Sequence, residues 1–336
     1  MTHMSHISAS EPRLDQEEAA KWLRLKVVNR RIVARDIVAF DLEDPAGEPL
    51  PVFAAGAHVD VRAGDGLIRQ YSLCNDPRER HRYRLGILLD PQSRGGSAAI
   101  HAGFAEGELV DIGMPRNLFP IRDKARPALL FGGGIGITPI LAMAHELEAA
   151  GASFALHYCV RDASRAAFLD EIGAGALAPH CKVHFDDGAA EQRLDVAALL
   201  AGADRRTDLY VCGPAGFIDH VRSEARRVGW PDDQIHSESF DAAVDLSGGS
   251  FELIAERSGR RFIVPPGKSP AQVLLDAGID VPVSCEQGIC GTCLCDVLEG
   301  TPDHRDLIQS DEEKASNKQI ALCCSRSLTP VLRIDL

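Results

Sequence analysis

Four cysteines near the C-terminal end constrain the fold of this chain more than any other feature. Cys285, Cys290 and Cys293 form a C-x4-C-x2-C triplet, and Cys323 follows close to the end of the sequence. This spacing is typical of plant-type 2Fe-2S clusters. Glycines within the triplet permit a tight loop whose backbone amides can point at the cluster sulfurs. The sequence therefore predicts a 2Fe-2S centre in a small domain at this end.

Two alternatives to this assignment stay open. Four thiolates also suit zinc, although zinc ribbons generally use paired C-x2-C motifs rather than a triplet with a distant fourth cysteine. Cys324 adjoins Cys323, so spacing alone does not decide the fourth ligand, and we take Cys323. The other single cysteines stand in apolar or strand-like segments, where buried free thiols are expected: Cys74, Cys159, Cys181 and Cys212.

Composition excludes several classes of function. The 336 residues carry 49 acidic and 36 basic side chains, and a net charge of -13 disfavours a nucleic-acid partner. The first twenty residues lack the apolar core of a secretory signal. The most apolar window, 127–144, is interrupted by glycines and Pro139, which indicates a turn rather than a membrane span. We therefore expect a cytoplasmic protein without a membrane partner.

Hydrophobic patterning divides the chain into segments. Residues 1–21 predict a mobile tail, and alternating apolar residues over 22–123 predict an antiparallel β-barrel domain. Short apolar runs alternate with helical stretches over 124–240, which predicts an α/β domain with a parallel sheet. Small and polar residues at 241–249 predict a linker. Residues 250–336, with a hairpin around Ser258-Gly259 and a helix from Pro270, predict a β-grasp (α+β) ferredoxin domain.

Two glycine-rich turns in the α/β segment indicate a nucleotide site. The first, Gly132–Pro139, follows an apolar strand and predicts a helix with Thr138 as N-cap and Pro139 at its first position. It contains Gly134 but is not a G-x-G-x-x-G fingerprint. The second, Cys212-Gly213-Pro214, follows a later strand. Because α/β sheets bind ligands outside the carboxyl ends of their strands, the two turns predict a shared crevice.

The barrel segment carries two motifs that suit a flavin. Arg69-Gln70-Tyr71-Ser72 offers a cation for a phosphate, an aromatic ring for a flavin edge and a hydroxyl for a ring nitrogen. Arg94-Gly95-Gly96-Ser97 offers glycine amides and a hydroxyl at the start of a short helical stretch, as a phosphate loop does. Either motif alone also fits an ordinary strand or surface turn.

Together with Pro115–Phe119, these motifs occur in an order that resembles the phthalate dioxygenase reductase family, which includes the reductases of vanillate O-demethylases. The resemblance covers Trp22 to Leu336, with the cluster domain last rather than first. It implies that the barrel domain binds FMN rather than FAD, that the α/β domain binds NADH, and that the C-terminal domain holds the 2Fe-2S cluster.

The resemblance also implies roles for individual residues. Arg69, Gln70, Tyr71 and Ser72 would line the flavin site, and Arg94, Gly95, Gly96 and Ser97 would close over its phosphate. Gly134 and Thr138 would border the nicotinamide nucleotide, and Asp186 belongs to an acidic turn. Cys212, Gly213 and Pro214 would lie near the nicotinamide and Phe240 near the flavin. A buried core thiol is an equally good interpretation of Cys212.

These features predict an NADH-dependent oxidoreductase in which cofactors carry the chemistry. NADH gives two electrons as a hydride and the cluster takes one at a time, so FMN must stand between them, and no residue is expected as general acid or base. Asp162 and the pair Asp186-Asp187 favour NADH over NADPH, because their carboxylates would repel a 2′-phosphate, whereas Arg161 and Arg165 argue the reverse.

The expected partner is a terminal Rieske non-heme iron oxygenase, met transiently by a monomer. Acidic residues such as Asp303, Asp306 and Glu312 are candidates for that contact, although a solvated acidic loop is the more common explanation of such a charge run. Two alternatives are a reductase for another oxygenase acceptor and a non-enzymatic iron-sulfur carrier or redox sensor.

Overall fold

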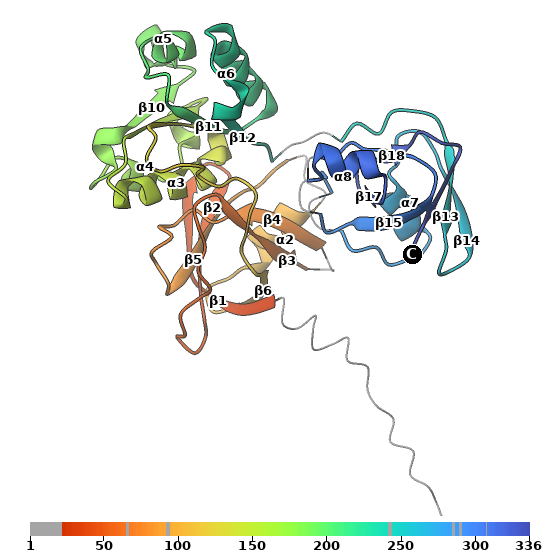
Figure 1. The fold of residues 1–336 in the computed structure, drawn as a ribbon. Helices are drawn as coiled ribbons and strands as arrows, with labels where there is room; N and C mark the ends of the chain where they lie inside the picture. The colour runs from red at the N-terminus through yellow and green to blue at the C-terminus, as the bar shows by residue number, and fades with distance from the viewer. Residues whose placement is uncertain are drawn as a thin grey trace, which may run out of the picture.

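The computed structural model describes residues 22–64, 67–91, 95–240, 244–283, 286–288, 291–306 and 308–336. The described chain forms three parts, coloured red to orange, yellow to green, and cyan to blue along the sequence (Figure 1). Each part has a main sheet of its own within one of the three predicted domains, and the third part also has a small two-stranded sheet. The predicted tail lies outside the described residues, and the exact domain boundaries stay a prediction.

The first part is an antiparallel barrel. Its seven-stranded sheet has the order β4-β3-β6-β1-β2-β5, with β7 paired to β3, and a bridge between Leu73 and Leu85 brings the two ends together. The alternation seen in the sequence follows from burial, since Leu25 and Val27 point into the core. The elements are β1 (Trp22–Ala34), β2 (Ile37–Glu43), β3 (Ala57–Ala63), β4 (Leu67–Ser72), β5 (Arg82–Leu88), α2 (Gly96–Gly103), β6 (Leu109–Gly113) and β7 (Arg116–Asn117).

The second part is a parallel sheet of order β10-β9-β8-β11-β12, with helices packed against it. The chain runs from β8 outward to β9 and β10 and then returns to β11 on the other side of β8. This reversal is where open α/β sheets bind ligands. The elements are β8 (Ala128–Gly133), η1 (Gly134–Gly136), α3 (Ile137–Ala149), β9 (Phe154–Val160), α4 (Leu169–Ile172), β10 (Cys181–Phe185), α5 (Val196–Ala201), β11 (Asp208–Cys212), α6 (Ala215–Arg227) and β12 (Ile235–Glu238), with short 3-10 turns at η2 (Ala163–Arg165), η3 (Ala178–His180), η4 (Ala190–Gln192) and η5 (Asp232–Gln234).

The third part is a five-stranded mixed sheet of order β14-β13-β19-β15-β17, in which β13 and β19 are parallel. The predicted helix is α7, whose N-cap Ser269 forms a capping box with Gln272. The elements are β13 (Phe251–Ala255), β14 (Arg260–Val264), α7 (Pro270–Asp276), β15 (Leu294–Glu299), β16 (Pro302–Asp303), α8 (Asp311–Ser316), β17 (Gln319–Ala321), β18 (Arg326–Ser327) and β19 (Val331–Ile334). The three parts match the predicted fold class.

The barrel and the α/β part share one apolar core. Ile37, Ala39 and Phe119 of the first part belong to the same buried cluster as Leu130 and Ile140 of the second. The third part has a separate core of its own. Within the residues that the structure describes, no helix combines the length and the apolar character needed to cross a membrane.

Candidate functional site

A cavity of about 1110 Å³ opens where the three parts meet. Its walls come from β4 of the barrel, from the turns that follow β8 and β11, and from the loop that carries the cysteine triplet. The predicted residues that line it are Arg69, Gln70, Tyr71, Ser72, Ser97, Gly134, Thr138, Asp186, Gly213, Pro214 and Phe240. Motifs that are distant in the sequence therefore border one space.

On the barrel side, Arg69 and the start of α2 form a cradle. A Cβ at Gly96 would lie 2.6 Å from Cγ of Arg69, so only glycine lets that side chain pass the helix start. Gly95 has φ of 94°, a left-handed conformation that glycine tolerates. Ser97 accepts a hydrogen bond from the Asp90 amide through Oγ at 3.2 Å. A guanidinium beside a helix N-terminus with glycine amides is the arrangement that a phosphate needs.

The rest of the β4 motif is held by the neighbouring strand. Gln70 donates to Oδ1 of Asp60 at 3.2 Å, and Asp60 also pairs with Arg116 at 2.7 Å. Burial raises the pKa of Tyr71 to about 12, with Arg69 opposing the shift. The Tyr71 phenol is therefore neutral and can donate a hydrogen bond at the cavity wall. The predicted Arg94 lies outside the described residues.

On the α/β side, close backbone packing accounts for the glycine turns. A Cβ at Gly136 would collide with the Cys212 carbonyl, so the start of α3 and the end of β11 can approach because no side chain intervenes. Gly134 has φ of 55°. The predicted cap is wrong in detail, because Thr138 lies inside α3 and its hydroxyl donates to the Ile135 carbonyl at 3.0 Å.

Cys212 itself lies behind the cavity wall. The side chain is fully buried in the core shared by the first two parts, and burial raises the pKa of its thiol well above the usual range. A neutral thiol of this kind is not a nucleophile. The adjacent Gly213 and Pro214 line the cavity instead. The core interpretation of Cys212 therefore fits the structure better than a side-chain contact with a ligand.

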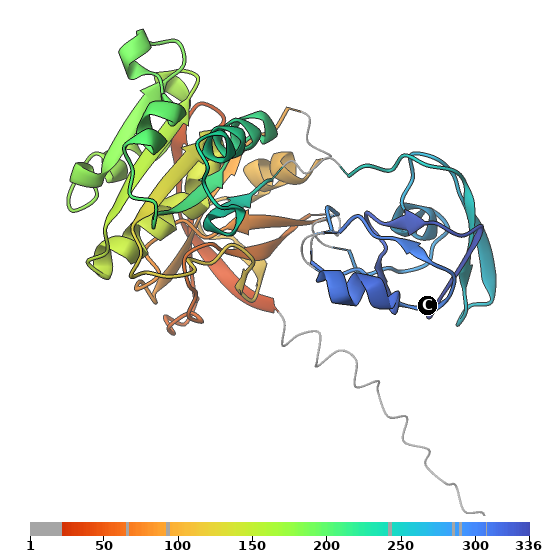
Figure 2. The same cartoon turned by 45° about the horizontal axis from the view of Figure 1, so that its top comes forward.

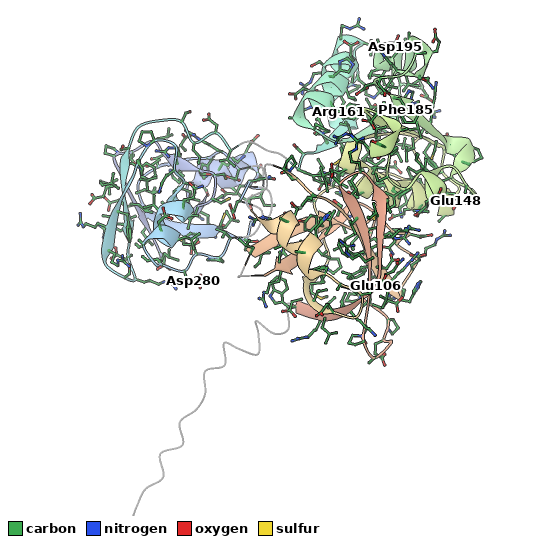
Figure 3. The ribbon with its side chains drawn as sticks, turned by 180° about the vertical axis from the view of Figure 1, so that it is seen from behind. Glu106, Glu148, Arg161, Phe185, Asp195 and Asp280 are labelled. Atoms are coloured by element: carbon green, nitrogen blue, oxygen red, sulfur yellow. The ribbon has the colours of Figure 1, made fainter. Side chains whose placement is uncertain are left out.

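The far end of the cavity is bordered by Asp186 together with three arginines, Arg161, Arg165 and Arg193. In Figure 3, Arg161 and Phe185 lie close together at the carboxyl ends of β9 and β10. Asp162 is engaged elsewhere, since its carboxylate accepts from the Ser164 amide at 2.9 Å and caps η2. Of the carboxylates that favour NADH in the sequence, Asp162, Asp186 and Asp187, Asp186 is the one that lines the cavity.

Glu238 is a cavity residue that the sequence analysis did not single out. It ends β12 opposite Cys212, and its Oε2 is buried without a hydrogen-bond partner among the described residues. Burial raises the pKa of its carboxyl to about 8. A carboxyl kept neutral at the carboxyl end of a parallel strand can donate a hydrogen bond to a bound amide or carbonyl. Its position at a strand end beside Phe240 was the available signal.

Two of the four predicted cluster ligands lie in the described residues. Cys293 and Cys323 are 3% and 6% exposed, and the Cys323 amide donates to Sγ of Cys293 at 3.4 Å. Cys285 and Cys290 lie outside the described residues. An amide that points at a ligand sulfur suits an iron-sulfur cluster, so the donor set fits the predicted group.

The neighbouring Cys324 occupies a different position from Cys323. It is fully buried, and its Sγ lies 3.8 Å from the Ala321 carbonyl. A Cβ at Gly288 would lie 2.5 Å from the same sulfur, and Gly288 has φ of 75°. The cysteine loop therefore packs closely over Cys324, whereas Cys323 contacts Cys293.

The chain is similar to known proteins both in its C-terminal domain and over most of its length. Residues 253–328 match the family model described as 2Fe-2S iron-sulfur cluster binding domain. The chain is 50% identical over 308 residues to the vanillate O-demethylase oxidoreductase of Pseudomonas sp. (strain HR199 / DSM 7063), covering 91% of this chain and 97% of that protein. It is 40% identical over 318 residues to the phthalate dioxygenase reductase of Burkholderia cepacia, covering 94% and 98%.

A solved structure of phthalate dioxygenase reductase superimposes with a TM-score of 0.74 at 40% identity, covering 96% of this chain and 99% of that one. That protein is described as a modular structure for electron transfer from pyridine nucleotides to [2Fe-2S]. The similarity spans all three parts of the fold.

Proposed function

This chain belongs to the phthalate dioxygenase reductase family, and from that premise we propose that it passes electrons from NADH through FMN and a 2Fe-2S cluster to a Rieske-type oxygenase. The sequence predictions of family, fold class, oxidoreductase class and cofactors are confirmed. The chain is thus an NADH-dependent reductase of an oxygenase system rather than a carrier without enzyme activity. The Rieske nature of the partner and the electron path are the proposal.

The observation that carries the proposal is the single cavity bordered by all three parts. FMN, when bound, supplies the chemistry, because it accepts a hydride and gives up electrons singly. On the barrel side, Arg69, Gly95, Gly96 and Ser97 hold the flavin phosphate, and Tyr71 and Ser72 border the ring. These roles rest on the cradle geometry, in which glycine leaves room for a cation at a helix start.

The α/β side orients the nicotinamide nucleotide. We place its phosphates at Gly134 and Thr138, where the backbone at the start of α3 is open to the cavity. Asp186 would border its adenosine end, and Gly213, Pro214 and Glu238 would border its nicotinamide. The neutral Glu238 carboxyl would donate a hydrogen bond to the nicotinamide amide.

The cluster end completes the path. Cys285, Cys290, Cys293 and Cys323 hold the 2Fe-2S cluster in this proposal, and Cys324 supports the loop from beneath. Hydrogen bonds such as that from the Cys323 amide to Cys293 tune its potential.

Asp306, one of the acidic residues considered for contact with the oxygenase, is 1% exposed and accepts from the Gln309 amide, so it belongs to the core rather than to a docking face. Transient oxygenase contact, a monomeric state and a cytoplasmic location stay predictions.

The proposal is tested with the purified holoprotein and a purified Rieske oxygenase component. Under anaerobic conditions, catalytic amounts of this protein with NADH should reduce the Rieske centre, seen as bleaching of its visible bands. The control omits NADH. A flavin-loaded protein that consumes NADH but leaves the Rieske centre oxidised, while reducing another acceptor such as a cytochrome, would contradict the Rieske assignment.

A further inference from the structure

The described part of the cysteine loop, residues 286–288, reaches the other two parts of the molecule. Gln287 lines the cavity, and its Nε2 donates to the Phe240 carbonyl at 2.7 Å. Phe240 is the last described residue before the predicted linker and lies two residues after the end of β12. The hydrogen bond thus ties the loop that carries the cysteines to the point where the chain leaves the α/β part.

The same loop also contacts the barrel. Glu286 lies 3.7 Å from Arg69, measured from Oε1 to Nη1, and the two side chains are 29% and 21% exposed. Arg69 is itself fixed by donation to the Ile68 carbonyl at 2.8 Å and by its contact with Gly96. Glu286 has φ of 56°, which is uncommon for a residue with a side chain and persists where the surroundings hold it.

Contacts at this loop matter because, among the described residues, the apolar core of the cysteine-bearing part is separate from that of its neighbours. Its buried cluster comes from residues 251 onward with Val244 against it, whereas the first two parts have a common core. In Figure 1 and Figure 2 this part stands beside the end of the barrel that carries β3, β4 and α2. A domain attached by a linker and a small polar interface moves unless specific contacts hold it.

We propose that Gln287 and Glu286 are positioning residues that seat the cysteine loop against the flavin site and so set the rate of electron transfer into the cluster. The inference rests on the proposed function. The Gln287 contact is shorter and joins the linker end directly, so it carries the larger effect. The Glu286 ion pair is longer and partly solvated, so its effect is smaller.

The test compares Gln287→Glu with Gln319→Glu, and Glu286→Gln with Glu312→Gln. Gln287→Glu removes the donor and opposes a carboxylate to the Phe240 carbonyl. Gln319 is an exposed glutamine of the same part that donates to Asp296, and Glu312 is an exposed glutamate of α8. Each control makes the same chemical change away from the cavity.

Anaerobic stopped-flow absorbance separates NADH-driven flavin reduction from the later reduction of the cluster. Flavin reduction should change less than cluster reduction in Gln287→Glu and Glu286→Gln, and neither step should change in the two controls. Cluster reduction should slow about tenfold or more in Gln287→Glu and a few-fold in Glu286→Gln, because a misplacement of about 1 Å between reacting groups can cost a rate up to about 10²-fold. The rate of backbone hydrogen exchange in the 240–249 segment should rise more in Gln287→Glu than in Glu286→Gln. A residue that only tuned the cluster would leave this rate unchanged.

The inference would be overturned if the Gln287 and Gln319 variants reduced the cluster at equal rates. It would also be overturned if a changed midpoint potential of the cluster alone explained the slower rate. If Gln287→Glu does not load a cluster, the Glu286→Gln pair decides by the same readouts. Failure of the proposed function itself looks different, because the wild-type protein would then lack flavin or cluster.

Discussion

The two interfaces of this reductase are built differently. Between the barrel and the α/β part, the core is continuous, and Arg84 of β5 is buried between Asp41 at 2.7 Å and Glu171 of α4 at 2.8 Å. Glu146 of α3 also accepts from the Ala55 amide of the barrel at 2.6 Å. At the third part, polar contacts from the cysteine loop, those of Gln287 and Glu286, reach across from a separate core.

This difference suits the two kinds of transfer in the proposed electron path. Hydride transfer requires two rings held at a fixed distance and angle, which a shared core provides. Single-electron transfer into the cluster requires proximity only, and the cluster must also meet an external oxygenase. A lightly held domain reconciles these two demands, because it can sit near the flavin and still expose its cluster side.

Removal of a cluster ligand should separate the two halves of the reaction most completely. Cys293→Ser is expected to abolish the 2Fe-2S absorbance and essentially all electron delivery to the oxygenase, while NADH still reduces the flavin. The measurement is visible absorbance with paired assays of flavin and oxygenase reduction. Cys295→Ser is the matched control, since Cys295 lies outside the predicted ligand set. Loss of flavin reduction in Cys293→Ser would show that the parts are not independent.

Arg84→Met should destabilise the unit formed by the first two parts. Removing one partner of a buried ion pair leaves charge uncompensated and typically costs about 3–5 kcal/mol. Calorimetry should show a lower unfolding temperature for that unit with the cysteine-bearing part unaffected. Arg333→Met, which breaks exposed pairs with Glu256 and Glu299, should leave unfolding unchanged. Equal destabilisation of all three parts would contradict the description of two dissimilar interfaces.

The buried Glu238 carboxyl should make the free energy of unfolding of the unit formed by the first two parts depend on pH. Its pKa in the folded state, about 8, is above the ordinary value of 4.5, so the folded protein keeps a proton that the unfolded chain loses. Its stabilising effect is complete below pH 4.5 and is lost as the pH rises toward 8. Denaturant titrations should show that the free energy of unfolding differs less between pH 5 and pH 8 in Glu238→Gln than in wild type. An identical difference in the two proteins would disprove the raised pKa of Glu238.

The smallest expected effect concerns the choice of nucleotide. Asp186→Asn removes the carboxylate at the cavity while Arg161 and Arg193 remain to attract a 2′-phosphate. The ratio of kcat/KM for NADPH to that for NADH should rise about tenfold, the effect expected of one like-charge repulsion relieved. Asp162→Asn, whose carboxylate caps η2, should leave the ratio unchanged. A response from both variants would show that general charge, not position, sets the preference.

Much of this architecture could be predicted from the sequence because its signals are local. The alternating apolar residues in the sequence of β5, the glycine turn after β8 and the cysteine spacing each reflect chemistry within a few residues. The position of Thr138 inside α3 was not predicted, because η1 begins the helical turn earlier than the Thr-Pro pair suggests.

Contacts between distant segments could not be predicted in the same way. Glu238 becomes buried only through the packing of β12 beside β11, and the Gln287 bond to Phe240 joins two parts across a linker. Likewise Asp162 and Asp186 look equivalent in sequence, yet a local cap turns one away from the cavity. Such features depend on tertiary packing, which leaves no periodic pattern in the sequence.

Anaerobic titration of the purified holoprotein with NADH tests the relay from NADH through FMN to the cluster. Visible absorbance follows the flavin, low-temperature electron paramagnetic resonance follows the cluster, and chromatography identifies the released flavin. We expect the released flavin to be FMN, its absorbance to bleach, and a rhombic 2Fe-2S signal to grow with added NADH. Absence of flavin, or a cysteine site filled with zinc and silent on reduction, would contradict it.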